Sequence, residues 1–191
     1  MNWYMKSVIA EKVQPSDSDF SWAFVSVPEN IMEVHSLVTR EIDKFDLYIE
    51  EGEKKGDWSY GIEDTPHITV KYGFEFDDPK SVIDCLKGEK GGSVEVNGIE
   101  IFEQDDYDVL VATVKSEALN RLHEKLTEEL KVPDSYPEYK PHITIAYFKK
   151  GMAKEYEYMA HRSFIYYLLN FDFNEVTFED TKDHQTKITL K

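Results

Sequence analysis

The chain has 191 residues, of which 41% are hydrophobic and 31% are charged, a balance typical of a globular domain rather than a disordered chain. Its formal net charge of −16 repels polyanions and argues against binding to duplex DNA or long RNA, while a small anionic ligand in a locally basic pocket stays open. Cys85 is the only cysteine, which excludes an intramolecular disulfide and favours a buried apolar role for this side chain. Residues 1–13 lack the apolar run of a signal peptide and no stretch reaches membrane-spanning length, so we expect a cytoplasmic protein.

The first third of the chain combines regular elements with two irregular stretches. Residues 1–19 are polar, end in a run of Pro, Ser and Asp, and are interpreted as an N-terminal extension. Residues 20–27 (FSWAFVSV) predict a strand, and apolar residues near a 3.6-residue period predict a helix over residues 31–44. Residues 45–66 are a long acidic insertion of a length typical of lid loops.

Strands and helices alternate through the rest of the chain. Strands are predicted at residues 67–72, 94–102 (with a bulge at Asn97-Gly98), 108–115 and 142–147. Helices are predicted at residues 80–86, 116–130 and 156–169, and a closing hairpin from residues 171–179 and 186–190. Two similar halves of this kind predict a two-lobed α+β fold with a mixed or antiparallel sheet in each lobe. No linker divides the chain, so we expect a single domain over residues 1–191.

One heptapeptide occurs twice, as PHITVKY at residues 66–72 and as PHITIAY at residues 141–147. The offset is 75 positions (142 − 67), and five of the seven residues are identical. A strand sends residues i and i+2 to the same face, so the His and Thr of each copy should point the same way. The repeat therefore predicts two lobes that face each other across a cleft, each contributing one imidazole and one hydroxyl.

These four side chains suit phosphodiester cleavage. With an unperturbed pKa near ~6.5, one His can be neutral and the other charged at neutral pH, giving a proton acceptor and a proton donor. Thr69 and Thr144 would donate hydrogen bonds to the non-bridging phosphate oxygens, where charge accumulates. The scheme needs no metal and no cofactor, and a zinc site is less favoured because His-x-Thr repeats lack the usual ligand spacing.

The paired His67-x-Thr69 and His142-x-Thr144 strands resemble the motifs of the 2H phosphoesterase superfamily, which includes RNA 2′,3′-cyclic phosphodiesterases of the LigT type and several phage proteins. The resemblance implies a pseudo-symmetric fold with a central cleft. It also implies that His67 and His142 are the acid–base pair and that Thr69 and Thr144 hold the phosphate. The order of base and acid depends on the direction of the substrate and is left open.

Within this superfamily, residues 137–144 (PEYKPHIT) look most like phage enzymes that destroy cyclic oligonucleotide immune signals, the anti-CBASS nucleases. The expected function is therefore hydrolysis of cyclic nucleotides or cyclic oligonucleotides, as a phage countermeasure acting in the host cytoplasm. The insertion at residues 45–66 departs from the compact members of that group. Two alternatives remain open: an enzyme that opens 2′,3′-cyclic phosphates or processes 2′–5′ RNA ends, and a non-catalytic nucleotide-binding sponge.

Further side chains are candidates for binding a small nucleotide or short oligonucleotide. Lys71 should share the face of His67 and could reach a phosphate, and Lys140 lies in a locally basic segment. Aromatic residues near the motifs could stack on bases, with Tyr139 as the strongest candidate and core packing as the alternative: Trp22, Phe24, Trp58, Tyr60, Tyr136 and Tyr139. Two other groups are expected to be structural, Tyr72 and Tyr147 on the face opposite the histidines, and His35, His123, His161 and His184 as surface or satisfied residues.

Overall fold

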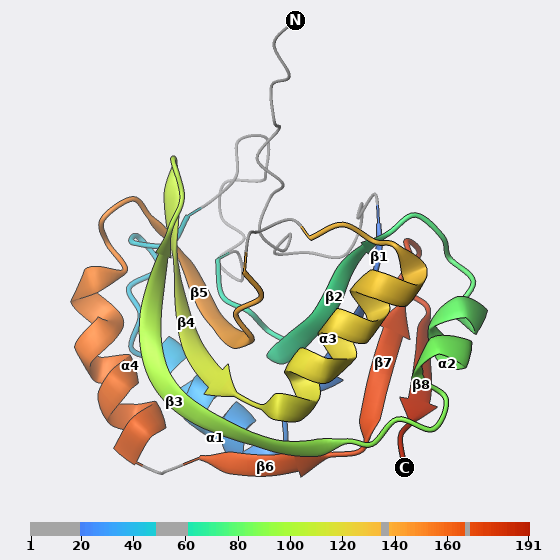
Figure 1. Cartoon of the computed structure of the whole chain (residues 1–191). Coiled ribbons are helices and arrows are strands. Elements are labelled where there is room, and N and C mark those ends of the chain that lie inside the picture. Colours follow the sequence, from blue (N-terminus) through green and yellow to red (C-terminus); the bar gives the residue numbers. More distant parts are fainter. Residues whose placement is uncertain (1–19, 49–60, 135–137, 167–168) are drawn as a thin grey trace, which may run out of the picture.

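The computed structural model describes residues 20–48, 61–134, 138–166 and 169–191. Within these residues the strands form two four-stranded antiparallel sheets (Figure 1), so the α+β class predicted from the sequence is confirmed. The first sheet has the order β2-β1-β7-β8, with β1 (Ser21–Ser26), β2 (His67–Phe74), β7 (Glu175–Glu179) and β8 (Gln185–Thr189). The second has the order β5-β4-β3-β6, with β3 (Gly92–Glu103), β4 (Tyr107–Lys115), β5 (His142–Lys149) and β6 (Asn170–Phe173).

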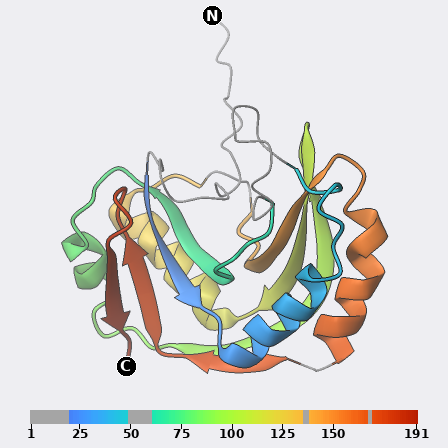
Figure 2. The same ribbon diagram turned by 180° about the vertical axis from the view of Figure 1, so that it is seen from behind.

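The helices interlock the two halves. They are α1 (Glu29–Thr39), α2 (Lys80–Leu86), α3 (Glu117–Leu130) and α4 (Lys154–Tyr166). Helix α1 follows β1 of the first sheet but packs with α4 against the second, whereas α3 follows β4 of the second sheet but packs with α2 near β2 (Figures 1 and 2). No helix in the described ranges is long and apolar enough to cross a membrane.

Most elements lie where local sequence patterns predict them. Helix α3 begins after Ser116, whose hydroxyl accepts a hydrogen bond from the Leu119 N–H, and it buries Leu119, Leu122 and Leu126. Strand β3 carries the predicted bulge, since Val96 pairs with Val114 and Gly98 with Thr113. Helix α1, however, ends five residues before the predicted boundary. Two turns follow Thr39, and in the second the Asp43 carboxylate accepts the Phe45 N–H.

The predicted closing hairpin is partly wrong. Strands β7 and β8 do pair, from Glu175 opposite Thr189 to Glu179 opposite Gln185. The preceding residues form a separate strand, β6, which pairs with Gly92–Glu95 at the start of β3 in the other sheet. The chain therefore changes sheets at Asn174, whose carbonyl accepts the Leu190 N–H. Pairing with so distant a strand leaves no local signal in the sequence.

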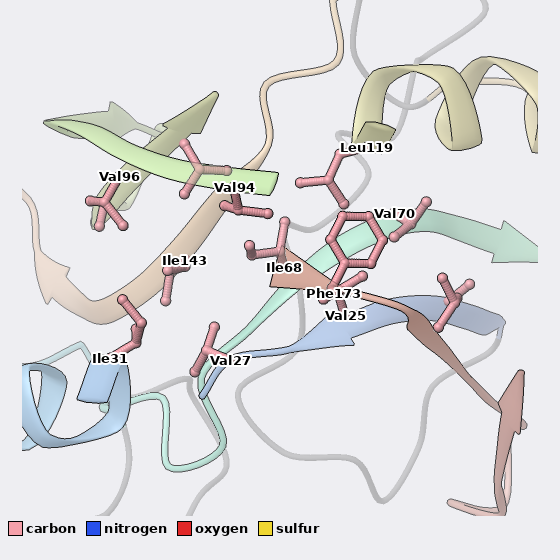
Figure 3. Close-up of a cluster of buried hydrophobic side chains, with 14 of the residues drawn as sticks. Val25, Val27, Ile31, Ile68, Val70, Val94, Val96, Leu119, Ile143 and Phe173 are labelled. Carbon is pink, nitrogen blue, oxygen red and sulfur yellow. The ribbon is translucent and has the colours of Figure 1, made fainter. Parts of the chain in front are cut away.

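A continuous apolar core joins the two sheets (Figure 3). Ile68 of β2 and Ile143 of β5 are both fully buried in it, beside Val25 and Ile31. Strands β2 and β5 contact each other, and they converge at the centre of the fold near their first residues, His67 and His142 (Figures 1 and 2). The core thus fixes the middle residue of each His-Ile-Thr triplet, and the His and Thr side chains lie on the other side of their strands.

A buried histidine of α1 lies behind β5. His35 is 4% exposed, and its ring is within hydrogen-bonding reach of the backbone of Ile145 and Thr144. Burial lowers the pKa of His35 from 6.5 to about 4, against the smaller opposite effect of these backbone groups. The imidazole is therefore neutral in the folded protein at neutral pH.

This environment predicts acid sensitivity of the fold. Between pH 6.5 and about 4 the unfolded chain binds a proton at His35 that the folded chain excludes, so the free energy of unfolding should fall by up to about 3 kcal/mol as the pH drops through this window. Urea unfolding of the wild type and of His35→Asn at pH 7, 5.5 and 4 measures the effect. The variant should lose less stability across the window than the wild type, and parallel curves would contradict the assignment.

Candidate active site

The imidazole of His67 is oriented by the main chain and enclosed by aromatic rings. Its Nδ1 lies 2.8 Å from the Thr65 carbonyl oxygen, which can only accept, so Nδ1 carries the hydrogen. The ring is 8% exposed and contacts Trp22 at 4.6 Å and Phe24 at 5.3 Å between centroids. This arrangement leaves Nε2 as the nitrogen that carries no hydrogen in the neutral ring.

His142 repeats this geometry in the second sheet. Its Nδ1 donates to the Lys140 carbonyl oxygen at 2.7 Å, again two residues earlier in the chain. A proline, Pro66 or Pro141, separates the carbonyl residue from the histidine in each copy and restricts the backbone in the same way. Phe102 of β3 packs edge-on against the His142 ring at 4.9 Å. Both neutral imidazoles therefore have the same tautomer, with the hydrogen on Nδ1.

Each motif strand has a β-bulge directly after its threonine. Along β2, Thr69 pairs with Phe24 and Lys71 with Ala23, which leaves Val70 without a partner in β1. Along β5, Thr144 pairs with Val111 and Ala146 with Leu110, which leaves Ile145 without a partner in β4. The two bulged residues are also 75 positions apart (145 − 70), so the bulge belongs to the repeat. It reverses the alternation of side chains beyond this point.

The bulges overturn two expectations that assumed unbroken alternation. Lys71 does not share the face of His67, because it pairs with the core residue Ala23, is 2% exposed, and places its ammonium 2.5 Å from Asp134 Oδ1. Lys71 is therefore held in an ion pair away from the phosphate position we expected it to reach. The second expectation placed Tyr72 and Tyr147 on the face opposite the histidines. Instead, Tyr72 pairs with Trp22 and lies on the same face of β2 as His67. Tyr147 packs with Val109 and Val111 on the same face of β5 as Thr144.

Of the aromatic candidates, Trp22 and Phe24 lie beside His67. Their rings stack at 4.4 Å, and Phe24 is only 4% exposed, so it supports the imidazole rather than offering an open surface to a base. The Trp22 Nε1–H donates to Glu179 Oε1 at 3.0 Å, and the other oxygen of Glu179 accepts from Gln185. This buried carboxylate fixes the plane of the Trp22 ring.

The remaining candidates divide into three groups. Tyr139 stacks one ring face on His123, and its hydroxyl donates a hydrogen bond to the Thr69 carbonyl oxygen, while the Lys140 side chain is exposed. Trp58, Tyr60 and Tyr136 lie outside the described residues. The described ends of the insertion at residues 45–66 pair with the edge of β5, with Leu47 opposite Phe148 and Ile62 opposite Ala146.

Two residues near the motifs, Phe102 and Glu179, escaped the sequence analysis, and His123, expected to be a surface or satisfied residue, is buried and hydrogen-bonded. Phe102 and Glu179 reach the motifs through strand pairing across the sheets, which leaves no local pattern. His123 follows Leu122 on the buried side of α3, where it donates to the Val70 carbonyl, lies beside Asp134 and stacks on Tyr139. In the described ranges, no group of three or more His, Cys, Asp or Glu side chains could hold a metal ion.

Two imidazoles with the same tautomer, each followed by a threonine on its own face, have the chemistry needed for acid–base catalysis at a phosphate. Residues 34–184 match the model of the 2′-5′ RNA ligase superfamily, and the chain belongs to this family of 2H phosphoesterases. It is a phosphodiesterase of the hydrolase class. No curated protein matches the chain.

Solved structures share the fold at low sequence identity. The protein TT0787 of Thermus thermophilus is 17% identical with a TM-score of 0.56, covering 89% of this chain and 97% of that chain. Kluyveromyces marxianus Usb1 with uridine monophosphate is 10% identical with a TM-score of 0.53, covering 90% and 98%. E. coli LigT complexed with ATP is 12% identical with a TM-score of 0.50, covering 92% and 96%. These solved structures and the chain thus share one fold.

The ion pair behind β2 predicts an asymmetric response to mutation. Burial acts to raise the pKa of Asp134, but the hydrogen bond and charge of Lys71 outweigh it and lower the pKa. Asp134→Asn leaves the Lys71 ammonium buried without its anion and should cost about 2 kcal/mol, below the ~3–5 kcal/mol of fully buried pairs, because Asp134 is 41% exposed. Lys71→Met removes the charge and should cost less than about 1 kcal/mol.

Urea unfolding at pH 7 measures both changes. Asp84→Asn is the matched control, since it removes the same group from an exposed pair with Lys80 and should have no measurable effect. Equal losses for Asp134→Asn and Lys71→Met would contradict the buried pair.

Proposed function

We propose that the chain cleaves phosphodiester bonds in small nucleotides or short oligonucleotides by acid–base catalysis between His67 and His142, without a metal ion or cofactor. The observation that carries the proposal is the repeated Nδ1 hydrogen bond, to the Thr65 carbonyl in one copy and to the Lys140 carbonyl in the other. A neutral ring held in this way offers the Nε2 lone pair as a base, and a charged ring offers Nε2–H as an acid. One geometry therefore supports both roles.

The proposed reaction is an in-line displacement at phosphorus. One imidazole takes a proton from the attacking water or ribose 2′-hydroxyl as its oxygen bonds to phosphorus. The other gives a proton to the departing oxygen as the P–O bond breaks. Thr69 and Thr144 donate hydrogen bonds to the non-bridging oxygens, where negative charge grows. Trp22 excludes water from the buried His67 ring, and Phe102 packs against the more exposed ring of His142.

For the substrate, we place cyclic nucleotides or cyclic oligonucleotides first. The likeness of residues 137–144 to signal-destroying phage enzymes supports this choice, and with it a role as a phage countermeasure in the host cytoplasm. The net charge of −16 favours a short substrate over a long polymer or duplex DNA. The second candidate is opening of 2′,3′-cyclic phosphates or processing of 2′–5′ RNA ends, which is supported by the fold shared with LigT and with the uridine monophosphate complex of Usb1.

The decisive experiment follows products from purified protein in EDTA. Cyclic dinucleotides, cyclic trinucleotides and 2′,3′-cyclic mononucleotides are supplied separately, and products are identified by chromatography and ³¹P NMR. His67→Ala and His142→Ala should each lower kcat by about 10²–10⁴-fold, because each removes one proton transfer, while ligand binding persists. His161→Ala, an exposed histidine on α4, is the matched control and should retain full activity.

The pattern of substrates then decides between the alternatives. Turnover of cyclic oligonucleotides alone supports signal destruction, and opening of 2′,3′-cyclic phosphates alone supports RNA-end processing. Tight binding without products would identify a sponge and contradict the catalytic assignment.

Paired acid–base work also predicts a bell-shaped dependence of kcat/KM on pH. One imidazole must be neutral and the other charged, so the rate should fall on both sides of its maximum. In His67→Ala or His142→Ala, the pH profile of the residual rate should no longer fall on the side that the removed imidazole controls. A wild-type rate that changes in one direction only across pH 5–9 would count against the pair.

A further inference from the structure

The segment that leads into the second motif is hydrogen-bonded to the strand of the first. The Tyr139 hydroxyl donates to the Thr69 carbonyl oxygen at 2.8 Å. The next residue, Lys140, provides the carbonyl that accepts the Nδ1–H of His142 at 2.7 Å. The Thr69 backbone is therefore linked to the His142 imidazole by two hydrogen bonds and the peptide unit between Tyr139 and Lys140.

The Tyr139 ring is clamped by a buried histidine of α3. The rings of Tyr139 and His123 stack at 3.9 Å with an interplanar angle of 2°. His123 donates from Nδ1 to the Val70 carbonyl oxygen at 2.7 Å, and its Nε2 lies 3.0 Å from Asp134 Oδ1. This ring is 8% exposed, so it has little room to reorient. The stack limits the Tyr139 ring to a position from which its hydroxyl reaches Thr69.

A related connection runs in the opposite direction. The segment that leads into the first motif pairs with β5, through the Glu63 N–H to the Ile145 carbonyl oxygen at 3.3 Å. Glu63 also accepts the Thr65 N–H, and Thr65 provides the carbonyl that orients His67. Each motif strand thus anchors the segment that orients the other histidine. The contact of the first-motif segment with β5 is a hydrogen bond between main-chain groups. The contact of the second-motif segment with Thr69 uses the Tyr139 side chain, so a mutation can remove it.

From these contacts we propose that Tyr139 is a positioning residue, which aligns the His142 imidazole with the first motif through its hydrogen bond to Thr69. The role rests on the proposed function, because it matters for catalysis only if His142 exchanges a proton. It differs from the base-stacking role expected from the sequence. A positioning residue acts on kcat, whereas a base-stacking residue acts mainly on KM.

The test is Tyr139→Phe in the full chain, which removes one oxygen and keeps the ring that stacks on His123. We expect kcat to fall on the order of 10-fold, with KM changed by less than about 3-fold, since a small misalignment of a catalytic group is costly. We also expect ¹⁵N NMR of the imidazoles to show His142 losing its single Nδ1–H tautomer. Circular dichroism and thermal unfolding confirm that the variant is folded.

Tyr156→Phe is the matched control. Its hydroxyl accepts a hydrogen bond from the Asp43 N–H and donates one to the Asp46 carboxylate, but at α4 away from the motifs. This variant should keep the wild-type kcat and the wild-type His142 signal. A similar loss of kcat in both variants would assign the effect to general loosening of the fold and overturn the proposal.

The outcomes separate this inference from the proposed function. Unchanged kcat with raised KM in Tyr139→Phe would make Tyr139 a substrate contact and overturn the positioning role. Unchanged kinetics together with an unchanged His142 tautomer would also overturn it. If the wild type turns over none of the nucleotides, the proposed function fails, and the NMR signal of His142 still decides whether Tyr139 orients that ring.

Discussion

The two His-x-Thr motifs lie on edge strands of separate sheets, and this constraint shapes the rest of the structure. Strand β2 ends one sheet and β5 ends the other, so no ladder of hydrogen bonds fixes one motif relative to the other. Within a sheet, pairing would set such a distance to a fraction of an ångström. Here the relation depends on apolar packing between Ile68 and Ile143 and on the segments that cross from one half to the other.

Crossing segments therefore recur throughout the fold. Helices α1 and α3 each leave one sheet and cover the other, and each places a buried histidine against the bulged strand behind it. The segment before His67 likewise contacts β5 of the other sheet, and the segment before His142 contacts β2. Side chains and loops thus satisfy backbone groups at the two edges that a further strand would otherwise pair.

The sequence was sufficient to predict features that depend on local pattern or on the repeat itself. The duplicated heptapeptide predicted the two strands β2 and β5, which begin at His67 and His142, and the period of apolar residues located α3 from its Ser116 cap onward. The bulge in β3 was also predictable, because Asn97-Gly98 is a recognisable local signal. Features set by distant pairing were not predictable: β6 joined the other sheet, and Phe102 and Glu179 reached the motifs from strands far along the chain.

The bulges at Val70 and Ile145 explain the largest error in the sequence analysis. Each is a β-branched residue in an apolar run, which predicts a regular strand, and the irregularity arises only from its register with a distant neighbour. Simple alternation therefore placed Lys71 with His67. A single extra residue in each strand reverses that assignment and returns Tyr72 and Tyr147 to the motif side.

The position after the bulge also explains why the two halves are held differently. The residue at this position faces the core in both copies. In β5 this residue is Ala146, an apolar side chain that can be buried there without a counter-charge. In β2 it is Lys71, whose ammonium must be neutralised where it is buried. Asp134 neutralises this ammonium, and the ion pair holds the segment after α3 against β2. Asp134 also lies beside His123 and precedes Tyr139 in the chain. The difference between Lys71 and Ala146 thus fixes against β2 the segment whose Lys140 carbonyl orients His142.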